Sequence, residues 1–256
     1  MTRNERIQRL IAAIPDLGNY RLQLVDRVVV AFNQPKDFKR DSKSSLITPE
    51  VLEDFGDILR MHHCLSHEPF SKDKFEHALE CVLKEAGIAA TMAPRGQRGF
   101  DIEVAGEKFS LKTEAAKAIR ENMIHISKFM ELGGGTWGSK PKDLIGLREQ
   151  FLSALEGIRR ILVLRALKKG NPFFLYELIE IPKSLLLKAA SGRLEMMMDS
   201  KQQPKPGYCH VEENSNTLFK LYFDGGGERK LQVKGLQKAL CTVHATWQFE
   251  SPTGSL

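Results

Sequence analysis

The 256-residue sequence contains only four cysteines, and they lie far apart. Cys64, Cys81, Cys209 and Cys241 form no CxxC pair, which excludes a disulfide framework and favours reduced thiols in a cytosolic protein. The histidines around Cys64, in residues 62–67, match no standard zinc spacing. We therefore expect neither a disulfide scaffold nor a structural zinc site.

Long apolar runs are missing as well. No stretch approaches the ~18 apolar residues that a membrane span needs, and the charged N-terminus is not followed by the apolar region of a signal peptide. Hydrophobic residues make up 42% of the chain and charged residues 27%, which is typical of a soluble globular protein. These absences predict a cytoplasmic protein without a membrane partner.

A nucleotide-binding loop is also absent. The glycine-rich segment 133–140 ends in Gly138, Ser139 and Lys140, whereas a P-loop requires Gly-Lys followed by Ser or Thr. We interpret this segment as a flexible connection and predict no nucleotide cofactor. The chain does carry an excess of basic residues, with a net charge of +6, which mildly favours a polyanionic partner.

Helical periodicity predicts two helices, at residues 4–14 and 20–32, in an N-terminal extension covering 1–47. This pair would either pack on the core or hold a dimer together, and residues 33–47 look like a polar loop. Thr48 and Pro49 predict the N-cap and first position of a helix that ends near residues 62–64. A further helix is expected over 71–87.

Residues 98–117 show the period-two alternation of a half-buried β-hairpin. Gly106 and Glu107 suit a two-residue type II′ turn. That turn would place Glu103 opposite Ser110 and Asp101 opposite Lys112. One face would then carry carboxylates around a lysine.

The remaining pattern predicts a strand at 88–92, a helix at 142–158, strands at 160–166 and 173–181, and a short helix at 183–190. Residues 123–130 are ambiguous between strand and helix. Four further strands are expected at 208–211, 218–223, 229–234 and 240–249. We predict an α/β (α+β) fold in one domain, 1–256, with a mixed central sheet flanked by helices, a core at 71–166 and a strand-rich part at 192–256.

Carboxylates beside a lysine on a sheet suit metal-assisted phosphoryl chemistry. Mg²⁺ prefers carboxylate and carbonyl oxygens, and such an ion acidifies water and offsets charge in the transition state. The lysine can orient the water or stabilise charge on phosphorus. The simpler interpretation is an exposed strand pair with ordinary cross-strand ion pairs.

The order of elements over 71–166, with an acid and a lysine on adjacent strands, resembles the PD-(D/E)XK nuclease superfamily. Several local strings resemble the SmaI family of type II restriction endonucleases more closely, in the same order from about residue 50 to the C-terminus. They are Phe75–Ala78, Leu111–Lys117, Met130–Gly133, Glu180–Leu187, Pro204–Tyr208, Leu221–Gly225 and Glu228–Gln232, followed by His244 and Trp247.

The resemblance implies that Asp101 and Lys112 are the leading acid and the lysine of the motif. The position two before the lysine, normally Asp or Glu, is Ser110, so the second metal ligand is open. Glu114 lies in a matching string and is the first choice, as a catalytic residue and metal ligand. The alternatives are Glu76 and Glu103, and the backbone carbonyl of Leu111 would complete the site.

The resemblance further implies a Mg²⁺-dependent homodimer of a restriction-modification system in a prokaryotic cell. Such an enzyme would cut double-stranded DNA at the centre of CCCGGG to leave blunt ends. Two polar segments, 200–208 and 224–230, are candidates for DNA contact, through Lys201, Gln203, Lys205, Arg229 and Lys230. The alternatives are a DNA-binding protein of the same fold without cleavage activity and a DNA repair nuclease.

Overall fold

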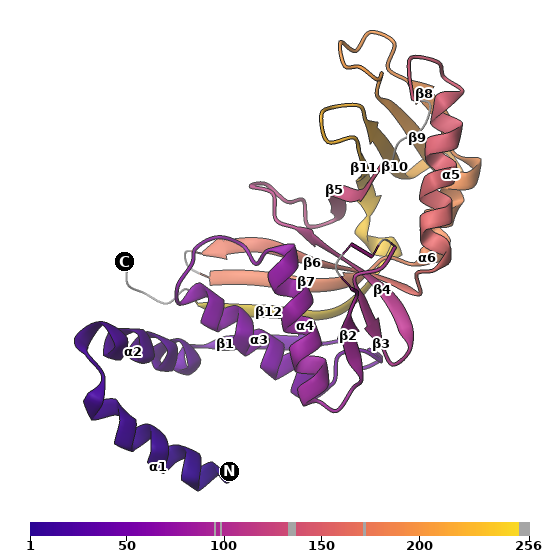
Figure 1. Cartoon of the computed structure of the whole chain (residues 1–256). Coiled ribbons are helices and arrows are strands. Elements are labelled where there is room, and N and C mark those ends of the chain that lie inside the picture. Colours follow the sequence, from indigo (N-terminus) through magenta and orange to yellow (C-terminus); the bar gives the residue numbers. More distant parts are fainter. Residues whose placement is uncertain (95, 98, 133–136, 171–172, 251–256) are drawn as a thin grey trace.

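The structure is a computed structural model that describes residues 1–94, 96–97, 99–132, 137–170 and 173–250 (Figure 1). Its first sheet has seven strands in the order β1–β12–β7–β6–β4–β3–β2. Their bounds are β1 Lys36–Arg40, β12 Thr242–Glu250, β7 Phe173–Glu180, β6 Arg160–Gly170, β4 Glu107–Glu114, β3 Ile102–Val104 and β2 Ala90–Met92. The sheet is mixed, because β4 and β6 are parallel while the other neighbours are antiparallel.

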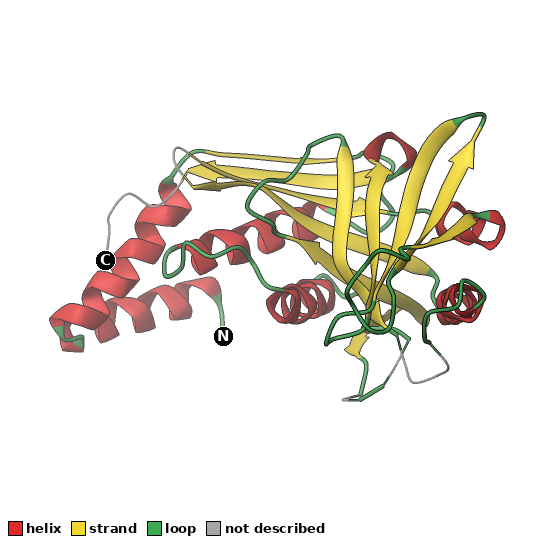
Figure 2. Ribbon diagram, turned by 90° about the horizontal axis from the view of Figure 1, so that it is seen from above, coloured by secondary structure: helices red, strands yellow, loops and turns green. Residues whose placement is uncertain are grey.

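A second sheet of five antiparallel strands stands beside the first, in the order β5–β11–β10–β9–β8 (Figure 2). Its strands are β5 Met123–Glu131, β11 Lys230–Gln237, β10 Asn216–Asp224, β9 Gly207–Glu213 and β8 Arg193–Met196. The ambiguous segment at 123–130 is thus a strand. Of the glycine-rich connection expected at 133–140, residues 133–136 lie outside the described residues.

Helices cover both sheets and divide the interior into two cores. The helices α3 (Pro49–His63) and α4 (Lys72–Glu85) pack their apolar faces on the first sheet. The helices α5 (Asp143–Glu156) and α6 (Lys183–Leu187), with the 3₁₀ turn Lys188–Ser191, pack on the second sheet. The predicted α/β (α+β) class, with a mixed sheet flanked by helices, is confirmed.

The helices α3 and α4 begin at the predicted residues, where side chains cap their N-termini. Thr48 accepts a hydrogen bond from the backbone N–H of Val51 at 3.2 Å, and Ser71 accepts one from Lys74 at 3.5 Å. Each cap satisfies a backbone donor that has no partner within its helix. On α3, Gly56 lets the helix approach the sheet closely, because a Cβ there would lie 2.2 Å from the ring of Phe38.

The hairpin register differs from the prediction by two residues. The turn is Ala105–Gly106, both with positive φ (50° and 82°), and Glu103 pairs with Lys108 rather than with Ser110. The backbone N–H of Ala105 donates to the carbonyl of Ala89 at 2.8 Å, a contact that a hairpin sequence alone does not reveal. Because the shift is even, each side chain keeps its predicted face.

Residues 36–40 were expected in a loop, and this prediction is wrong, because they form β1. The strand is polar, and it pairs antiparallel with β12, about 200 residues away, at the edge of the sheet. An edge strand needs little apolar side-chain burial, so periodicity does not identify it. The short strand β8 was missed for the same reason, since it also lies at a sheet edge.

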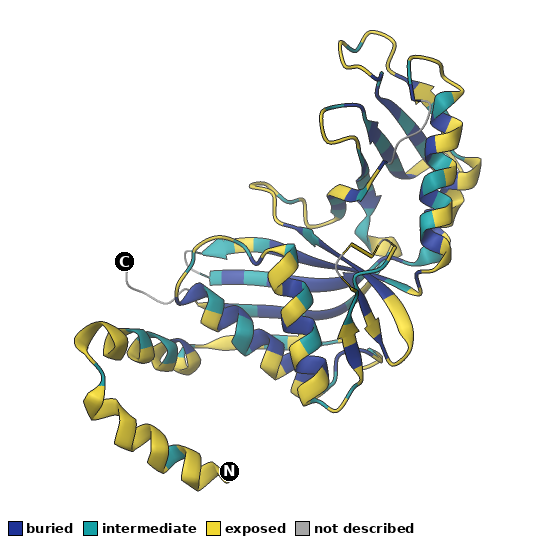
Figure 3. Cartoon of the chain, in the orientation of Figure 1, coloured by how far each residue is buried: buried dark blue, intermediate teal, exposed yellow. Residues whose placement is uncertain are grey.

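The N-terminal extension contains the two predicted helices, α1 (Arg3–Ala13) and α2 (Asn19–Asn33), joined by a 3₁₀ turn at Ile14–Asp16. It projects from the body as an arm (Figures 1 and 3). No residue of α1 is buried, and Ala31 is the single buried residue of α2. In the described part of the chain, no helix combines the length and apolarity needed to cross a membrane.

Candidate active site

Asp101 lies at the entrance to β3, where several donors converge on its carboxylate. One oxygen, Oδ2, accepts hydrogen bonds from the backbone N–H of Leu111 at 2.6 Å and from the hydroxyl of Ser110 at 3.1 Å. The ammonium of Lys112 lies 3.4 Å from the same oxygen. Asp101 and Lys112, predicted from the sequence, are therefore brought together by the hairpin.

The first two turns of α4 supply the other side of this group. Lys72 lies with its Nζ 2.8 Å from Oδ1 of Asp101, and it also pairs with Glu76. One ammonium thus joins the carboxylates of Glu76 and Asp101, which come from different elements. Glu76 had been predicted as a helix-borne acid, whereas Lys72 was missed, although its i,i+4 spacing from Glu76 is a visible signal.

The two lysines differ in their electrostatic surroundings. Burial lowers the pKa of Lys112, against the attraction of Asp101, and the neighbouring charge of Lys72 lowers it further. Burial also acts to lower the pKa of Lys72, but its bonds to Asp101 and Glu76 outweigh burial and raise it. Lys72 is therefore the firmly charged member, and Lys112 loses its proton more readily than an ordinary lysine.

Asp101 is ionised in this setting. Burial alone would raise its pKa, but Lys112 and Lys72, with the hydrogen bond from Leu111, hold the pKa of Asp101 below its usual value. Its side chain is 19% exposed, so a ligand can reach it from solvent. The ring of Phe129 on β5, 5.4 Å from the Lys112 ammonium, lines the site from the second sheet.

Glu114 lies on the same strand face as Lys112 but has other partners. Its carboxylate accepts hydrogen bonds from Arg165 and, at 3.0 Å, from the backbone N–H of His125. Arg165 also pairs with Glu177 and donates to the backbone carbonyls of residues 120, 121 and 123. The structure thus holds Glu114 in a buried ion network and does not bring it to Asp101. Burial raises the pKa of Glu114, against the hydrogen bond from Arg165.

Glu103 is the third acid expected near the site. It follows Asp101 by two residues, its backbone pairs with Thr91 and Lys108, and its side chain is exposed. Within the described residues there is no group of three or more His, Cys, Asp or Glu side chains that could hold a metal ion. The carboxylates of Asp101 and Glu76 nevertheless fit a cation, because one positive group already bridges them.

The two segments predicted to contact DNA lie side by side at one end of the second sheet. A Cβ on Gly225 would lie 1.9 Å from the backbone oxygen of Pro204, so the two backbones touch. Lys201, Gln203 and Arg229 are exposed, while Lys205 and Lys230 are half-buried. Lys205 donates to the backbone carbonyl of Ser200 at 2.5 Å, and Lys230 pairs with Glu228 at 3.1 Å.

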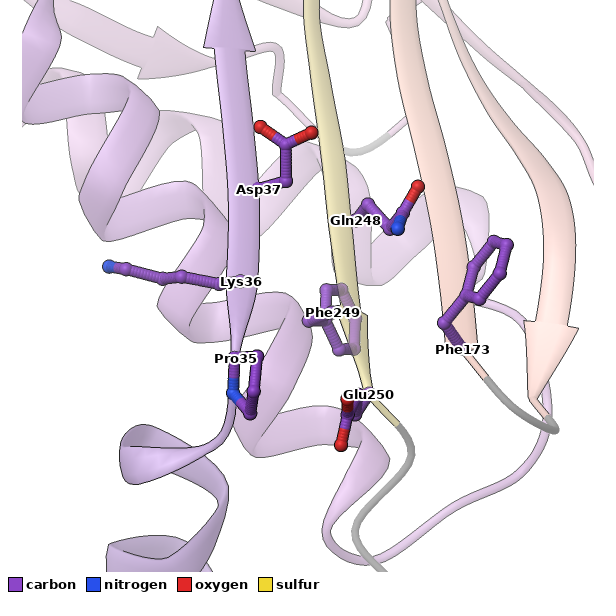
Figure 4. Close-up of a pocket in the computed structure, with 7 residues that line it drawn as sticks. All are labelled: Pro35, Lys36, Asp37, Phe173, Gln248, Phe249 and Glu250. Carbon is purple, nitrogen blue, oxygen red and sulfur yellow. The ribbon is translucent and has the colours of Figure 1, made fainter.

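A separate hollow of about 230 Å³ lies at the opposite edge of the first sheet, between β1, β12 and β7 (Figure 4). It is lined by Pro35, Lys36, Asp37, Phe173, Gln248, Phe249 and Glu250. The strand β6 stands between this edge and β4 in the sheet. The hollow is therefore not part of the group around Asp101.

A mixed sheet flanked by helices, with an acid and a lysine on adjoining strands, has the architecture of a restriction-endonuclease-like nuclease. The family model of SmaI, a type II site-specific deoxyribonuclease, matches residues 10–249. The chain belongs to this family and is a type II restriction endonuclease, an enzyme that acts on double-stranded DNA.

The curated type II restriction enzyme SmaI of Serratia marcescens is 46% identical over 224 residues, which cover 87% of this chain and 88% of that enzyme. A ribosomal RNA small subunit methyltransferase H of Chlamydia abortus is 30% identical over 95 residues, covering 37% of this chain and 32% of that enzyme. This second match is too short to show a shared family. No solved structure matches the chain.

Proposed function

We propose that this endonuclease cleaves both strands of duplex DNA at the centre of CCCGGG, leaving blunt ends, and that it needs Mg²⁺ and no nucleotide. Its substrate is intracellular DNA, which requires a cytoplasmic enzyme. The proposed reaction rests on one observation, which is that Asp101, Glu76 and Lys112 come together at a partly exposed point. The hexamer rests on the 46% identity to SmaI.

In the proposed site, Asp101 and Glu76 hold the ion, with the carbonyl of Leu111 as a further ligand. Bound Mg²⁺ would supply a Lewis acid for the scissile phosphate and its attacking water. Glu114 is the less favoured ligand, because Arg165 and the backbone of His125 already occupy its carboxylate. Glu103 stays an alternative on the exposed side of Asp101. Lys72 would leave its bridging position when the ion binds.

Lys112 is proposed as the residue that orients and deprotonates the attacking water. The water oxygen forms a bond to phosphorus in line with the 3′ oxygen, its proton passes to the neutral Lys112 amine, and the 3′ oxygen leaves with a proton from solvent. The products are a 5′-phosphate and a 3′-hydroxyl. A lowered lysine pKa favours this role, since a general base must be neutral near the working pH.

A palindromic site calls for a two-fold symmetric homodimer with one active site for each strand. Lys201, Gln203, Lys205, Arg229 and Lys230 are proposed to contact DNA, through phosphates or through the G·C edges exposed in the major groove. Their two segments form one continuous surface, which supports a joint role.

The test is digestion of a fully sequenced plasmid with and without Mg²⁺, in buffer free of nucleotide, followed by sequencing of the fragment ends. We expect Mg²⁺-dependent fragments that end blunt in CCC and GGG, and cleavage slowed by about 10²–10⁴-fold in the Lys112→Ala variant. Discrete ends at another sequence would overturn the hexamer alone. Intact plasmid that is still bound would indicate a non-cleaving DNA-binding protein, and cuts confined to damaged or branched DNA would indicate a repair nuclease.

A further inference from the structure

The N-terminal arm, residues 1–33, carries an unusual share of the exposed apolar surface. Ten of the seventeen large hydrophobic side chains that are exposed in the described chain lie within it. Scattered exposed apolar residues are normal on a soluble protein, but a contiguous set marks an interaction surface. The arm therefore presents a surface that a partner would cover.

The helix α2 is apolar on two separate faces. Its inner face, with Leu24, Val28 and Ala31, is partly or fully buried toward the body, whereas Leu22 and Val29 on another face are exposed. Val25 and Phe32 extend this outer face at helical spacing. A helix that is apolar on more than one side is normally enclosed on more than one side, and the body of this chain covers only one.

The arm is fixed in place at its base. The guanidinium of Arg60 on α3 donates to the backbone carbonyls of Ala31 and, at 3.1 Å, of Gln34. The thiol of Cys64 donates to the carbonyl of Arg27 at 3.7 Å. The C-terminal half of α2 is thus clamped on α3, while α1 extends away from the body (Figure 1). The helix α1 is therefore accessible to a second molecule.

We propose that the arm is the dimerisation element, and that the outer face of α2 and the apolar stripe of α1, including Leu10 and Ile14, dock on the same arm of a second copy of this chain. This inference rests on the proposed function, which requires two active sites for a palindrome. A two-fold contact is self-complementary, so an apolar stripe can serve as its own partner.

The size and charge of the surface suit a second copy. A standard interface buries about 800 Å² from each partner, and nine large apolar side chains of the arm between Leu10 and Phe32, each 39–68% exposed, offer an area of that order. The helix α1 carries Arg3, Arg6 and Arg9, and the exposed side of α3 carries Glu50 and Asp54. Because α3 holds the base of the arm, these opposite charges favour approach of one subunit's α1 to the base of the other subunit's arm.

The family model extends into the arm. The matched region begins at residue 10 and so includes Leu10, Ile14 and all of α2. The hollow of Figure 4 also begins where the arm ends, at Pro35, and adds a recess at the base of the proposed interface.

The test measures the mass of the full chain by analytical ultracentrifugation across micromolar concentrations. We expect a dimer for the unaltered chain and a dissociation constant raised at least 100-fold in Val25→Asp/Val29→Asp and in Leu10→Asp/Ile14→Asp. Because α1 buries no residue, the second variant should keep its circular dichroism and melting temperature. Leu65→Asp/Met198→Asp, at positions 57% and 55% exposed outside the arm, is the matched control and should stay dimeric.

Plasmid cleavage separates this inference from the proposed function. Folded, monomeric arm variants should nick a single-site plasmid and accumulate open circles, while the control cuts both strands together. Arm variants that stay dimeric, or an unaltered chain that is monomeric both alone and on DNA, would overturn the inference even if CCCGGG is cut. Loss of DNA affinity without a change in mass would do so as well, and would assign the arm to DNA. A dimer that depends on the arm but leaves CCCGGG intact would sustain the inference and reject the proposed site.

Discussion

Two ammonium groups share the carboxylate of Asp101, and their surroundings suit them to different tasks. Lys72 bridges two acids and is 39% exposed, which suits a mobile charge that can leave when an ion arrives. Lys112 is buried on the strand and contacts one carboxylate oxygen. Because its pKa is lowered, the fraction of neutral Lys112 increases as the pH rises.

This difference predicts the pH dependence of cleavage. The single-turnover rate should increase with pH through the lowered pKa of Lys112 and then level off. Lys112→Ala should lose about 10²–10⁴-fold in rate, the usual contribution of a general base, while DNA affinity changes little. Lys112→Arg keeps the charge but cannot lose its proton. Strong cleavage by the arginine variant would show that Lys112 acts only as a positive charge.

A second prediction separates the two acids that compete for the role of metal ligand. Glu76→Gln should weaken Mg²⁺ binding at least tenfold and leave the free energy of unfolding nearly unchanged. Glu114→Gln should do the reverse, because its carboxylate is bonded to Arg165 inside the protein. Calorimetric titration with Mg²⁺ and urea unfolding measure the two effects. Weakened Mg²⁺ binding in folded Glu114→Gln alone would restore the first choice made from the sequence.

For individual site residues, the sequence predicts which side chains come together when they belong to the same hairpin. Alternation along residues 100–114 is enough to place Asp101 and Lys112 together, because both belong to neighbouring strands. Glu76 is linked to Asp101 through Lys72, and this depends on Phe75 and Leu79, which pack α4 in the core. The alternation also puts Glu114 beside Lys112, but it cannot reveal Arg165, which comes from a strand some fifty residues later.

The strand β6 carries the main polar element of the interior. Arg165 on this strand is fully buried and binds both Glu114 on β4 and Glu177 on β7, so one guanidinium ties three strands together. Lys238 adds a second cation at Glu177. The same guanidinium donates to the backbone carbonyls of Arg120, Glu121 and Met123, the last of which begins β5, and so connects the two sheets.

Removing Arg165 should therefore be costly. Arg165→Met removes the guanidinium that two buried carboxylates share, leaving Glu177 with Lys238 and Glu114 with the backbone of His125. We expect a loss of about 3–5 kcal/mol in the free energy of unfolding, measured by urea denaturation. The exposed pair of Arg193 and Glu195 is the control, since Arg193→Met should change stability by less than about 1 kcal/mol. A loss below that bound for Arg165→Met would contradict a structural role for the network.

The contact of α3 with the sheet gives a pH-dependent term in stability. His63 stacks on Phe174 with ring centroids 3.6 Å apart and shares a hydrogen bond with the Tyr176 hydroxyl at 2.8 Å. Burial lowers the pKa of His63 to about 3. An ordinary histidine in the unfolded chain has a pKa near 6.5. Between about pH 3 and pH 6.5, this histidine is therefore protonated in the unfolded chain and neutral in the folded chain. Stability from His63 is thus complete above about pH 6.5 and is lost as the pH falls toward 3.

We expect the free energy of unfolding to fall by up to about 1.4 kcal/mol per pH unit below pH 6 because of this group. Urea unfolding at pH 7.5, 5.5 and 4.5 measures the slope, and His63→Gln should flatten it. The exposed Met61 on the same helix provides the comparison, since Met61→Gln removes no titratable group and should leave the slope unchanged. Parallel slopes for the unaltered chain and His63→Gln would refute the assignment.

Elements with strong local signals were predictable, and edge strands were not. The capped helices at Thr48 and Ser71 were predicted because their first turns carry the capping residues. β1 was not, because a segment with four charged residues around Phe38 became a strand through pairing with β12 near the other end of the chain. The hairpin turn moved by one position through a bond to Ala89 that lies outside the hairpin.

For the whole molecule, the sequence predicts the fold class better than the division into sheets. The strand-rich part expected at 192–256 supplies β8 to β11 to the second sheet, but β12 returns to the first and pairs with β7 and β1. No local pattern specifies such a return, since it depends on which edge is still unpaired. The group around Asp101 lies where β4 of the first sheet contacts β5 of the second, next to Phe129.

The overall charge of +6 gives the last prediction. Binding of duplex DNA releases counterions, so the affinity should fall linearly with salt on logarithmic axes. If Lys201 contacts a phosphate, Lys201→Ala should lower the slope by about 1 and weaken binding equally on specific and unrelated DNA. Fluorescence anisotropy with Lys112→Ala as the background, in buffer without Mg²⁺, measures binding without cleavage. Lys84, which is exposed on α4 and paired with Glu80, is the control.

The changes in salt dependence among the variants show which surface of the protein contacts the DNA backbone. An unchanged slope in Lys84→Ala, together with reduced slopes in Lys201→Ala and Arg229→Ala, would place the DNA backbone along the surface formed by residues 200–208 and 224–230. A variant that loses affinity for CCCGGG but keeps its slope would identify a base-reading residue instead, because base contacts release few counterions. Equal slopes in all three variants would remove this surface from the interface, and the DNA would have to be bound elsewhere on the basic molecule.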